Sequence, residues 1–297
     1  MGAEHVVRGA APGGVPARDQ AERARRLRDR VRENFDRGAG EYARFEDSSF
    51  FFRRLLDELL AGGPSLEGAR VLDVGCGTGA SLESLQERVG PAGRVCGVDL
   101  SLPMLRQARA RLGPGAQLAV LDGCELASAF RVAFDAVVYN AVLFLLPDAG
   151  ASLASARGVL VPGGRVYLSN LEGVYWDTGR SVPGELLARG YPAGRHALSP
   201  WGAVAQALGQ GFEGVQIRRW SVGLTPEQFL AFYGLEPMSA GLLPGLPFLE
   251  RRRVVQELAE EAAAEGRCLE QVWVLASARN PRLGGGSGEG LVGAEGR

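Results

Sequence analysis

The segment VLDVGCGTG, residues 71–79, joins a short apolar run to three closely spaced glycines. We predict that residues 71–74 form a strand and that the glycines turn the chain into the next helix. Gly75 and Gly77 permit a tight turn and let a ligand approach the backbone without a Cβ in the way. The N–H groups at the start of the following helix favour a carboxylate or a phosphate. The segment therefore predicts a ligand site at the end of a strand.

Apolar strands and helical stretches alternate along the middle of the chain. The predicted helices cover residues 79–89, 103–112 and 149–160, and the predicted strands cover residues 70–74, 94–99, 117–121, 134–140 and 165–170. Largely apolar strands with helices between them indicate a parallel sheet that is covered on both faces. The predicted fold is α/β, with a Rossmann-like, mostly parallel sheet and helices on both faces.

The last third of the chain has a different pattern. Residues 214–222 and 269–278 have the composition of strands, and the segments 226–233 and 249–265 between them have the composition of helices. We predict a mainly helical cap inserted between the last two strands. It should lie over the carboxyl edge of the sheet, where open α/β folds bind their ligands.

Composition excludes several kinds of chemistry. The 33 basic residues nearly cancel the 34 acidic ones, which disfavours nucleic acid as a partner. Every basic residue is arginine, so a Schiff-base lysine, a P-loop lysine and a Tyr-x-x-x-Lys pair are all excluded. Four scattered cysteines and two histidines lead us to expect no metal site. We expect free thiols, a cytoplasmic location and no membrane partner, because no signal peptide and no apolar run of about 18 residues is present.

Two kinds of cofactor fit the glycine turn. Together with Ala80, the turn satisfies the dinucleotide pattern G-x-G-x-x-G/A. Asp99, at the end of the next predicted strand, could hold ribose hydroxyls in either kind of ligand. Asp73 distinguishes between the two kinds of cofactor, because a carboxylate just before the turn suits a cationic ammonium group and would repel a pyrophosphate. Asp122 could accept a hydrogen bond from an adenine amino group. An NAD-dependent oxidoreductase remains the alternative.

A set of motifs in a fixed order then resembles one family. Residues 71–79 are followed by VCGVDLS at 95–101, LDG at 121–123, FDAVVYN at 134–140 and LVPGG at 160–164. This order resembles the class I S-adenosylmethionine-dependent methyltransferase family, small-molecule type, over roughly residues 70–170. Upstream, NFDRGAGEY at 34–42 is similar to the segment that precedes the core in many small-molecule members. One departure is that residues 125–132 replace the usual proline-rich stretch after the third strand.

The resemblance implies S-adenosyl-L-methionine as cofactor and assigns a role to each matching residue. The methionine part would be held by Asp73, Gly75, Cys76, Gly77 and Gly79. Asp99 would bind the ribose hydroxyls, and Leu100 would pack on the adenine. The adenine amino edge would meet Asp122 and Gly123, while Asn140 would lie near the sulfonium and Tyr42 would close over the cofactor.

The chemistry implied is in-line methyl transfer to a small, partly apolar organic molecule. We name no catalytic residue, although His196 is the only histidine within the predicted folded region and could act as a base or be structural. A non-catalytic, methyltransferase-like binding protein is a second alternative. The candidate acceptor pocket is aromatic, and the candidates are Tyr175, Trp176, Tyr191, Trp201, Phe229, Phe232, Tyr233 and Phe248. The sequence leaves the acceptor, the methylated atom and the oligomeric state open.

The chain divides into five predicted parts. Gly- and Pro-rich composition predicts a disordered tail at 1–20, and Gly-rich composition predicts a flexible tail at 281–297. Between the tails we expect N-terminal helices at 21–62, a cofactor-binding methyltransferase core at 63–172, and a substrate cap with the C-terminal strands at 173–280.

Overall fold

Seven strands form one sheet in the order β3-β2-β1-β4-β5-β7-β6. The structure is a computed structural model that describes residues 17–131, 133–193 and 199–282. The first five strands are parallel to their neighbours, and β7 is antiparallel to both β5 and β6. The strands are β1 Arg70–Val74, β2 Arg94–Asp99, β3 Gln117–Val120, β4 Phe134–Tyr139, β5 Leu160–Trp176, β6 Glu213–Leu224 and β7 Leu269–Arg279.

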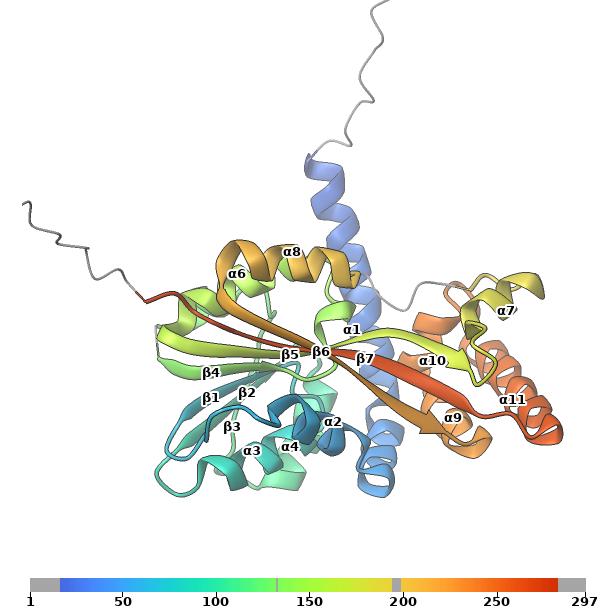
Figure 1. Cartoon of the computed structure of the whole chain (residues 1–297), viewed down its shortest axis with the longest axis horizontal. Coiled ribbons are helices and arrows are strands. Elements are labelled where there is room, and N and C mark those ends of the chain that lie inside the picture. Colours follow the sequence, from blue (N-terminus) through green and yellow to red (C-terminus); the bar gives the residue numbers. More distant parts are fainter. Residues whose placement is uncertain (1–16, 132, 194–198, 283–297) are drawn as a thin grey trace, which may run out of the picture.

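Helices cover both faces of this sheet (Figure 1). On one face lie α2 Phe51–Leu60, α3 Ala80–Val89 and α4 Leu102–Leu112. On the other lie α5 Leu126–Ala129, α6 Ala149–Val159 and α8 Trp201–Gly211. Neighbouring residues of one strand enter different cores, since Val71 packs with the first group and Leu72 with the second. The prediction of a Rossmann-like, mostly parallel α/β sheet is confirmed, because strands buried on both faces must be apolar throughout.

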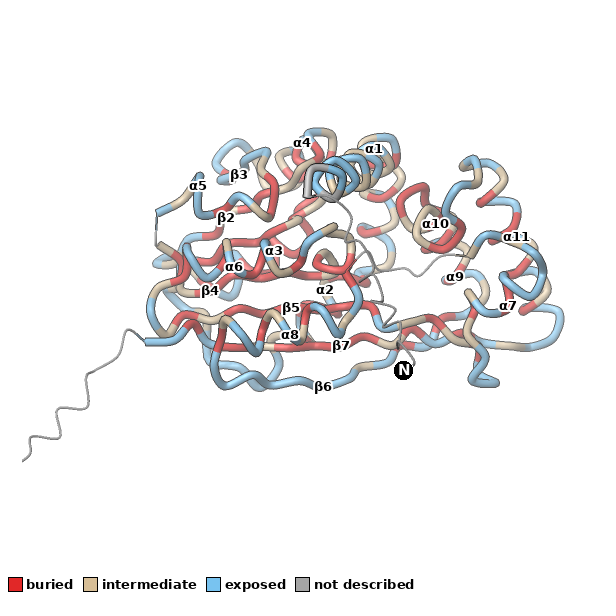
Figure 2. Tube along the Cα trace, turned by 90° about the horizontal axis from the view of Figure 1, so that it is seen from above, coloured by how far each residue is buried: buried red, intermediate tan, exposed pale blue. Residues whose placement is uncertain are grey.

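The cap lies between the last two strands, as the sequence predicted. It consists of α9 Pro226–Tyr233, α10 Glu236–Leu242 and α11 Phe248–Glu265. Helix α9 packs against the distal part of β5 and β7, which runs beyond the shorter parallel strands (Figures 1 and 2), through contacts of Phe229 with Trp176 and of Tyr233 with Gln271. Helices α10 and α11 pack against α9. At the edge of the sheet, β6 is exposed over most of its length (Figure 2).

The fifth strand is much longer than predicted. The predicted end of this strand at residue 170 was wrong, because β5 stays paired with β7 in the antiparallel direction from Arg165 to Trp176. A boundary between core and cap at residue 172 therefore falls inside one strand. The cap and the core share this strand instead of meeting at a linker.

The N-terminal region begins with one long helix, α1 Ala17–Ser49. The predicted N-terminal tail ends too late, at residue 20, because α1 already begins at Ala17. Residues 1–16 lie outside the described residues, and so do residues 283–297 of the predicted C-terminal tail. Phe50 is in the left-handed conformation with φ 53°, which separates α1 from α2. Gly38 lets α1 approach the cap, because a Cβ there would lie 2.8 Å from Cδ of Pro237 on α10.

Four further α-helices of the described residues were not predicted: α5, α7 Val182–Ala188, α8 and α10. The segment that forms α8 was assigned to the cap. Instead, Val204 and Leu208 bury α8 against the face of the sheet opposite the cap. In the part of the chain that the structure describes, no helix is long and apolar enough to cross a membrane.

Candidate cofactor and acceptor site

A cavity opens at the carboxyl edge of the sheet, and the space within it, open solvent at its mouth included, is about 1190 Å³. Its walls come from the ends of β1, β2, β3 and β4, from α1 above them, and from the cap. The cavity therefore extends from the glycine turn to the cap helices.

The glycine turn forms the floor of the cavity where β1 ends. The N–H groups of Gly75 and Cys76 both donate to the carbonyl of Val98 on β2, at 2.8 and 3.0 Å. Gly75, Gly77 and Gly79 all have positive φ, which only glycine adopts at little cost. This backbone geometry explains why the strand is followed by glycines at alternate positions.

The three glycines face different surroundings. A Cβ on Gly75 would lie 2.1 Å from Cγ2 of Val142, and one on Gly79 would lie 3.1 Å from Cβ of Ala108 on α4. A Cβ on Gly77 would meet nothing within 4 Å. Gly75 and Gly77 line the cavity, whereas Gly79 allows α3 and α4 to pack closely.

Asp99 ends β2 and is held in place by backbone N–H groups. Its Oδ2 accepts from Gly77 at 2.9 Å, and its Oδ1 accepts from Ser101 at 2.8 Å. Burial raises the pKa of Asp99, while these hydrogen bonds oppose the rise. Asp99 and Leu100 both line the cavity, in the places where the sequence put the ribose and the adenine.

Asp73 lies one residue before the end of β1 and is almost fully buried, with 1% of its surface exposed. Its Oδ2 has no hydrogen-bond partner within the described residues. Burial raises the pKa of Asp73 well above its ordinary value, and the negative charges of Asp99 and Glu46 raise it further. Asp73 lies behind the cavity wall, as do Cys76 and Gly79, so these three predicted residues are not wall residues.

Asp122 and Gly123 follow β3 and line the far side of the cavity. Asp122 accepts from the N–H of Cys124 at 2.9 Å through Oδ1 and forms an ion pair with Arg28 of α1 at 2.7 Å through Oδ2. Arg28 was not singled out from the sequence, where residues 23–32 have the composition of a solvated helix face. The ion pair holds the N-terminal half of α1 over the predicted position of the adenine.

Asn140 and Tyr42 are both buried where the two ends of the cavity meet. The Asn140 amide donates to the carbonyl of Phe52 and to Oγ of Ser81, at 2.9 and 3.0 Å. The Tyr42 ring stacks on the Phe52 ring, with centroids 5.6 Å apart. Burial raises the pKa of Tyr42 well above its ordinary value, followed by the charges of Glu46 and Asp99. Both side chains therefore line the cavity, and their contact with a cofactor stays a prediction.

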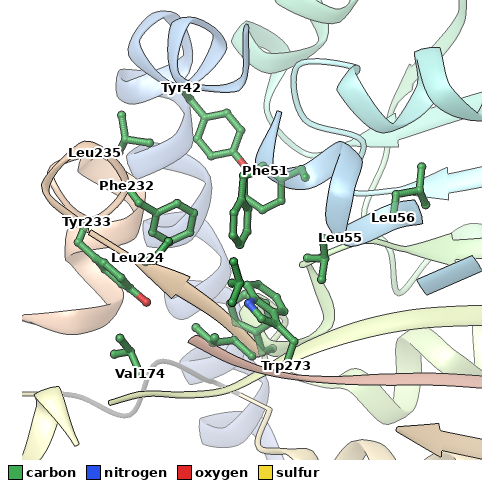
Figure 3. Close-up of a cluster of buried hydrophobic side chains, with 14 of the residues drawn as sticks. Tyr42, Phe51, Leu55, Leu56, Val174, Leu224, Phe232, Tyr233, Leu235 and Trp273 are labelled. Atoms are coloured by element: carbon green, nitrogen blue, oxygen red, sulfur yellow. The ribbon is translucent and has the colours of Figure 1, made fainter. Parts of the chain in front are cut away.

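The cap end of the cavity is apolar and aromatic. Figure 3 shows Tyr42 of α1, Phe232 and Tyr233 of α9 and Trp273 of β7 around one cluster. The cap-end wall consists mainly of Phe52, Phe144, Leu171, Phe232, Tyr233, Pro237, Met238, Gly241 and Trp273. Gln271 donates to the Tyr233 hydroxyl at 3.0 Å and accepts from Nε1 of Trp273 at 3.2 Å, which fixes two of these aromatic side chains.

Of the eight aromatic candidates for the acceptor pocket, only Phe232 and Tyr233 line the cavity. Trp176 and Phe229 pack on each other in the core of the cap, with centroids 6.4 Å apart. The other four candidates also lie outside the cavity wall, and they are Tyr175, Tyr191, Trp201 and Phe248. Sequence order alone could not show which face of β5 or α9 turns toward the ligand.

Several wall residues were missed. Phe35, Phe144 and Trp273 lie on a helix, a 3-10 turn and the last strand, far apart in the sequence. A local signal exists at Ala141, which lines the cavity with φ 60°, an uncommon conformation for a residue with a Cβ. His196 lies outside the described residues. Among the residues that are described, no group of three or more His, Cys, Asp or Glu side chains could hold a metal ion.

Comparison with known proteins places the sequence motifs in a family. Residues 71–164 match a family model described as a methyltransferase domain. The chain is 37% identical over 147 residues to nocamycin O-methyltransferase of Saccharothrix syringae, covering 46% of this chain and 49% of that protein. It is 40% identical over 129 residues to trans-aconitate 2-methyltransferase of Rhodopseudomonas palustris, covering 43% and 48%. The chain thus spans about half the length of these curated relatives.

Solved structures show the same fold at lower identity. The phosphoethanolamine N-methyltransferase 2 of Haemonchus contortus, in complex with S-adenosyl-L-methionine, superposes with a TM-score of 0.53. It is 20% identical, and the match covers 85% of this chain and 60% of that chain. A putative methyltransferase of Bacillus halodurans gives a TM-score of 0.52 at 16% identity, covering 77% and 98%. These likenesses support the Rossmann-like architecture described above.

Proposed function

We propose that this chain, whose residues 71–164 match a methyltransferase domain, is a class I S-adenosylmethionine-dependent methyltransferase that transfers a methyl group from S-adenosyl-L-methionine to a small, partly apolar organic molecule. The observation that carries the proposal is the buried, unpartnered carboxylate oxygen of Asp73 beside the glycine turn. Burying an isolated anion is costly unless a cation or donors compensate. Asp73 lies behind the cavity wall, so a cofactor whose positively charged end binds at the glycine turn would compensate this charge through space, whereas the pyrophosphate of NAD would be repelled.

The remaining residues suit the other parts of the same cofactor. Asp99 would accept hydrogen bonds from the ribose hydroxyls, since each of its oxygens is aimed and held by one backbone N–H. Leu100 would pack on the adenine, and Asp122 with Gly123 would meet its amino edge. Gly77 would leave room for the methionine part. The cofactor supplies an electrophilic methyl group, so the chain's own task is to align the acceptor and exclude water.

The cap supports an acceptor that is at least partly apolar. Pockets for organic ligands are mostly apolar with a few polar groups for orientation, and the cap end of the cavity has this character. The two curated relatives named above are called methyltransferases of nocamycin and of trans-aconitate, both small organic molecules. A small-molecule acceptor, rather than nucleic acid, is the proposal for this chain. The cytoplasmic location stays a prediction.

Isothermal titration calorimetry tests the cofactor directly. We expect S-adenosylmethionine and S-adenosylhomocysteine to bind with micromolar dissociation constants, about −8 kcal/mol, and NAD to give no measurable heat. Tight binding of NAD without any binding of S-adenosylmethionine would instead support the oxidoreductase. Binding of the cofactor without turnover on any acceptor would support a non-catalytic binding protein.

The acceptor requires a second assay. Release of S-adenosylhomocysteine is measured against a panel of small aromatic and aliphatic organic acids, phenols and amines, with RNA included as a comparison. We expect turnover with at least one apolar small molecule and none with RNA. Efficient methylation of RNA would contradict the proposed acceptor class.

A further inference from the structure

Glu46 is a buried acid on α1 that reaches the glycine turn. Its carboxylate accepts a hydrogen bond from the hydroxyl of Thr78, and only 8% of its surface is exposed. The carbonyl of Thr78 in turn accepts from Nε of Arg111 on α4, at 3.1 Å. Thr78 is therefore hydrogen-bonded to α1 through its side chain and to α4 through its backbone carbonyl.

Glu46 adds a third carboxylate to those of Asp73 and Asp99. Its charge raises the pKa values of Asp73, of the Tyr42 hydroxyl and of the Cys76 thiol, so it lies within electrostatic reach of the whole turn. The three carboxylates come from β1, β2 and α1; Asp73 and Glu46 are buried, and Asp99 is half-buried. Asp73 contributes the carboxylate oxygen without a partner.

The cations that face Glu46 are engaged elsewhere. Arg111 pairs with Asp47 at 2.5 Å and lies 3.8 Å from Glu83, and Arg53 on α2 pairs with the same Glu83. Burial is the largest influence on Glu46 and raises its pKa from 4.5 to about 7; the Thr78 hydrogen bond, Arg111 and Arg53 lower it, and Asp47 raises it. The arginines thus compensate the charge of Glu46 only in part.

We propose that Glu46 is a positioning residue for the cofactor: it fixes the glycine turn through Thr78 and concentrates negative charge where the cationic end of S-adenosylmethionine binds. This inference rests on the function proposed above. S-Adenosylmethionine has a sulfonium and an ammonium group, and S-adenosylhomocysteine keeps only the ammonium. Glu46 therefore favours the methyl donor over the demethylated product, which helps the product to leave.

A bound cation also favours the ionised form of Glu46. Near pH 7 about half of the free protein carries a proton on Glu46, and binding of the donor releases it. The affinity for S-adenosylmethionine should therefore rise as the pH increases from 6 to 8 and then level off. The affinity for S-adenosylhomocysteine should change less over the same interval.

The test is calorimetric titration of the full chain with each of the two ligands at several pH values, in buffers of different ionisation enthalpy. For the wild type we expect proton release on binding of S-adenosylmethionine near pH 7. For Glu46→Gln we expect about tenfold weaker binding of S-adenosylmethionine at pH 8, which is about 1.4 kcal/mol, with less proton release near pH 7 than in the wild type. Binding of S-adenosylhomocysteine should weaken by less than about threefold. Glu41→Gln is the matched control on the same helix, and it should behave as the wild type.

The outcomes separate this inference from the proposed function. If a folded Glu46→Gln variant keeps the wild-type affinity, pH dependence and preference for the donor, the role of Glu46 is overturned and the methyltransferase proposal stands. If the wild type binds neither ligand at any pH, the proposed function itself is overturned. If Glu46→Gln does not fold, Thr78→Val replaces it, since this change removes the hydroxyl and keeps the shape. It should weaken binding of S-adenosylmethionine and keep the proton release, and unchanged affinity would overturn the proposal.

Discussion

Gly77 and Asp99 are linked at the scale of single residues, because the N–H of one is held by the carboxylate of the other. Gly77 presents a bare backbone to the cavity, while Asp99 orders that backbone and keeps lone pairs for a ligand. The sequence predicted both residues, since strand, glycine turn and strand-end acid form a local pattern. It could not show that Asp73 and Cys76 lie behind the wall, because this depends on how β1 sits between β2 and β4.

Gly77→Val should abolish cofactor binding by filling the space where the methionine part lies. The substitution also costs about 1–3 kcal/mol of stability, because a branched residue is strained at φ 53°. Gly266→Val is the comparison, since Gly266 has φ 65°, also has open space around it and lies at the end of α11 outside the cavity wall. Melting curves should show destabilisation of both variants, with binding lost only in Gly77→Val. Normal binding by Gly77→Val would mean that Gly77 does not face the ligand.

Asp99→Ala should weaken binding of S-adenosylmethionine at least tenfold, about 1.4 kcal/mol, by removing charge-assisted hydrogen bonds to the ribose. Asp135→Ala is a comparison at the start of β4, where the carboxylate pairs with Arg70 and lies outside the cavity wall. Calorimetry on both variants checks the prediction. Equal affinities in folded proteins would refute the ribose role.

Among the larger elements, α1 and β5 show where prediction from sequence stops. The short parallel strands were placed to within a residue or two, because each is an apolar run bounded by turns. The length of β5 depends on pairing with β7, about a hundred residues later in the chain, and no local pattern reports that pairing. Likewise, α1 contributes Phe35 and Tyr42 to the cavity only because it crosses the edge of the sheet and meets α10 at Gly38.

Helix α10 gives the prediction that belongs to the element scale. Met238 is half-buried and lines the cap end of the cavity. Met238→Trp should fill that end and lower kcat/KM at least tenfold for the acceptor identified in the panel, about 1.4 kcal/mol, with the affinity for S-adenosylmethionine unchanged. Leu249→Trp, on the exposed surface of α11, is the control. Loss of cofactor affinity in Met238→Trp would show that α10 lies over the cofactor instead of the acceptor.

In the molecule as a whole, core and cap form one packed unit. Phe51 of α2 contacts Phe232 of the cap and Trp273 of β7, with ring centroids 5.4 and 6.0 Å apart. One hydrophobic cluster therefore runs from the helices beside the parallel strands to the cap helices (Figure 3). The predicted division into a core and a separate cap does not describe the packing, although it did locate the helical insertion. Where core and cap pack together beside the cavity, the carboxylates of Glu46 and Asp73 are buried.

That burial makes stability depend on pH through Glu46. The pKa of this carboxyl is 4.5 in an unfolded chain and about 7 in the folded protein, so between these pH values the folded state binds more protons. The contribution of Glu46 to stability is therefore fully present below pH 4.5 and is lost as the pH rises through 7. It amounts to at most about 3 kcal/mol. Asp73 and Asp99, whose pKa values are also raised, act in the same direction.

Glu46→Gln removes this dependence, so without ligand the variant should be more stable than the wild type at pH 8 by up to about 3 kcal/mol, with a smaller difference at pH 5. Urea denaturation of both proteins at the two pH values measures it, with Glu41→Gln as control. Parallel changes in wild type and variant would contradict the assignment of the pKa. Saturation with S-adenosylmethionine should narrow this difference at pH 8 by about 1.4 kcal/mol, because the tenfold tighter binding expected for the wild type stabilises it more than the variant. The negative charge of Glu46, which destabilises the ligand-free protein at pH 8, then stabilises the bound cofactor.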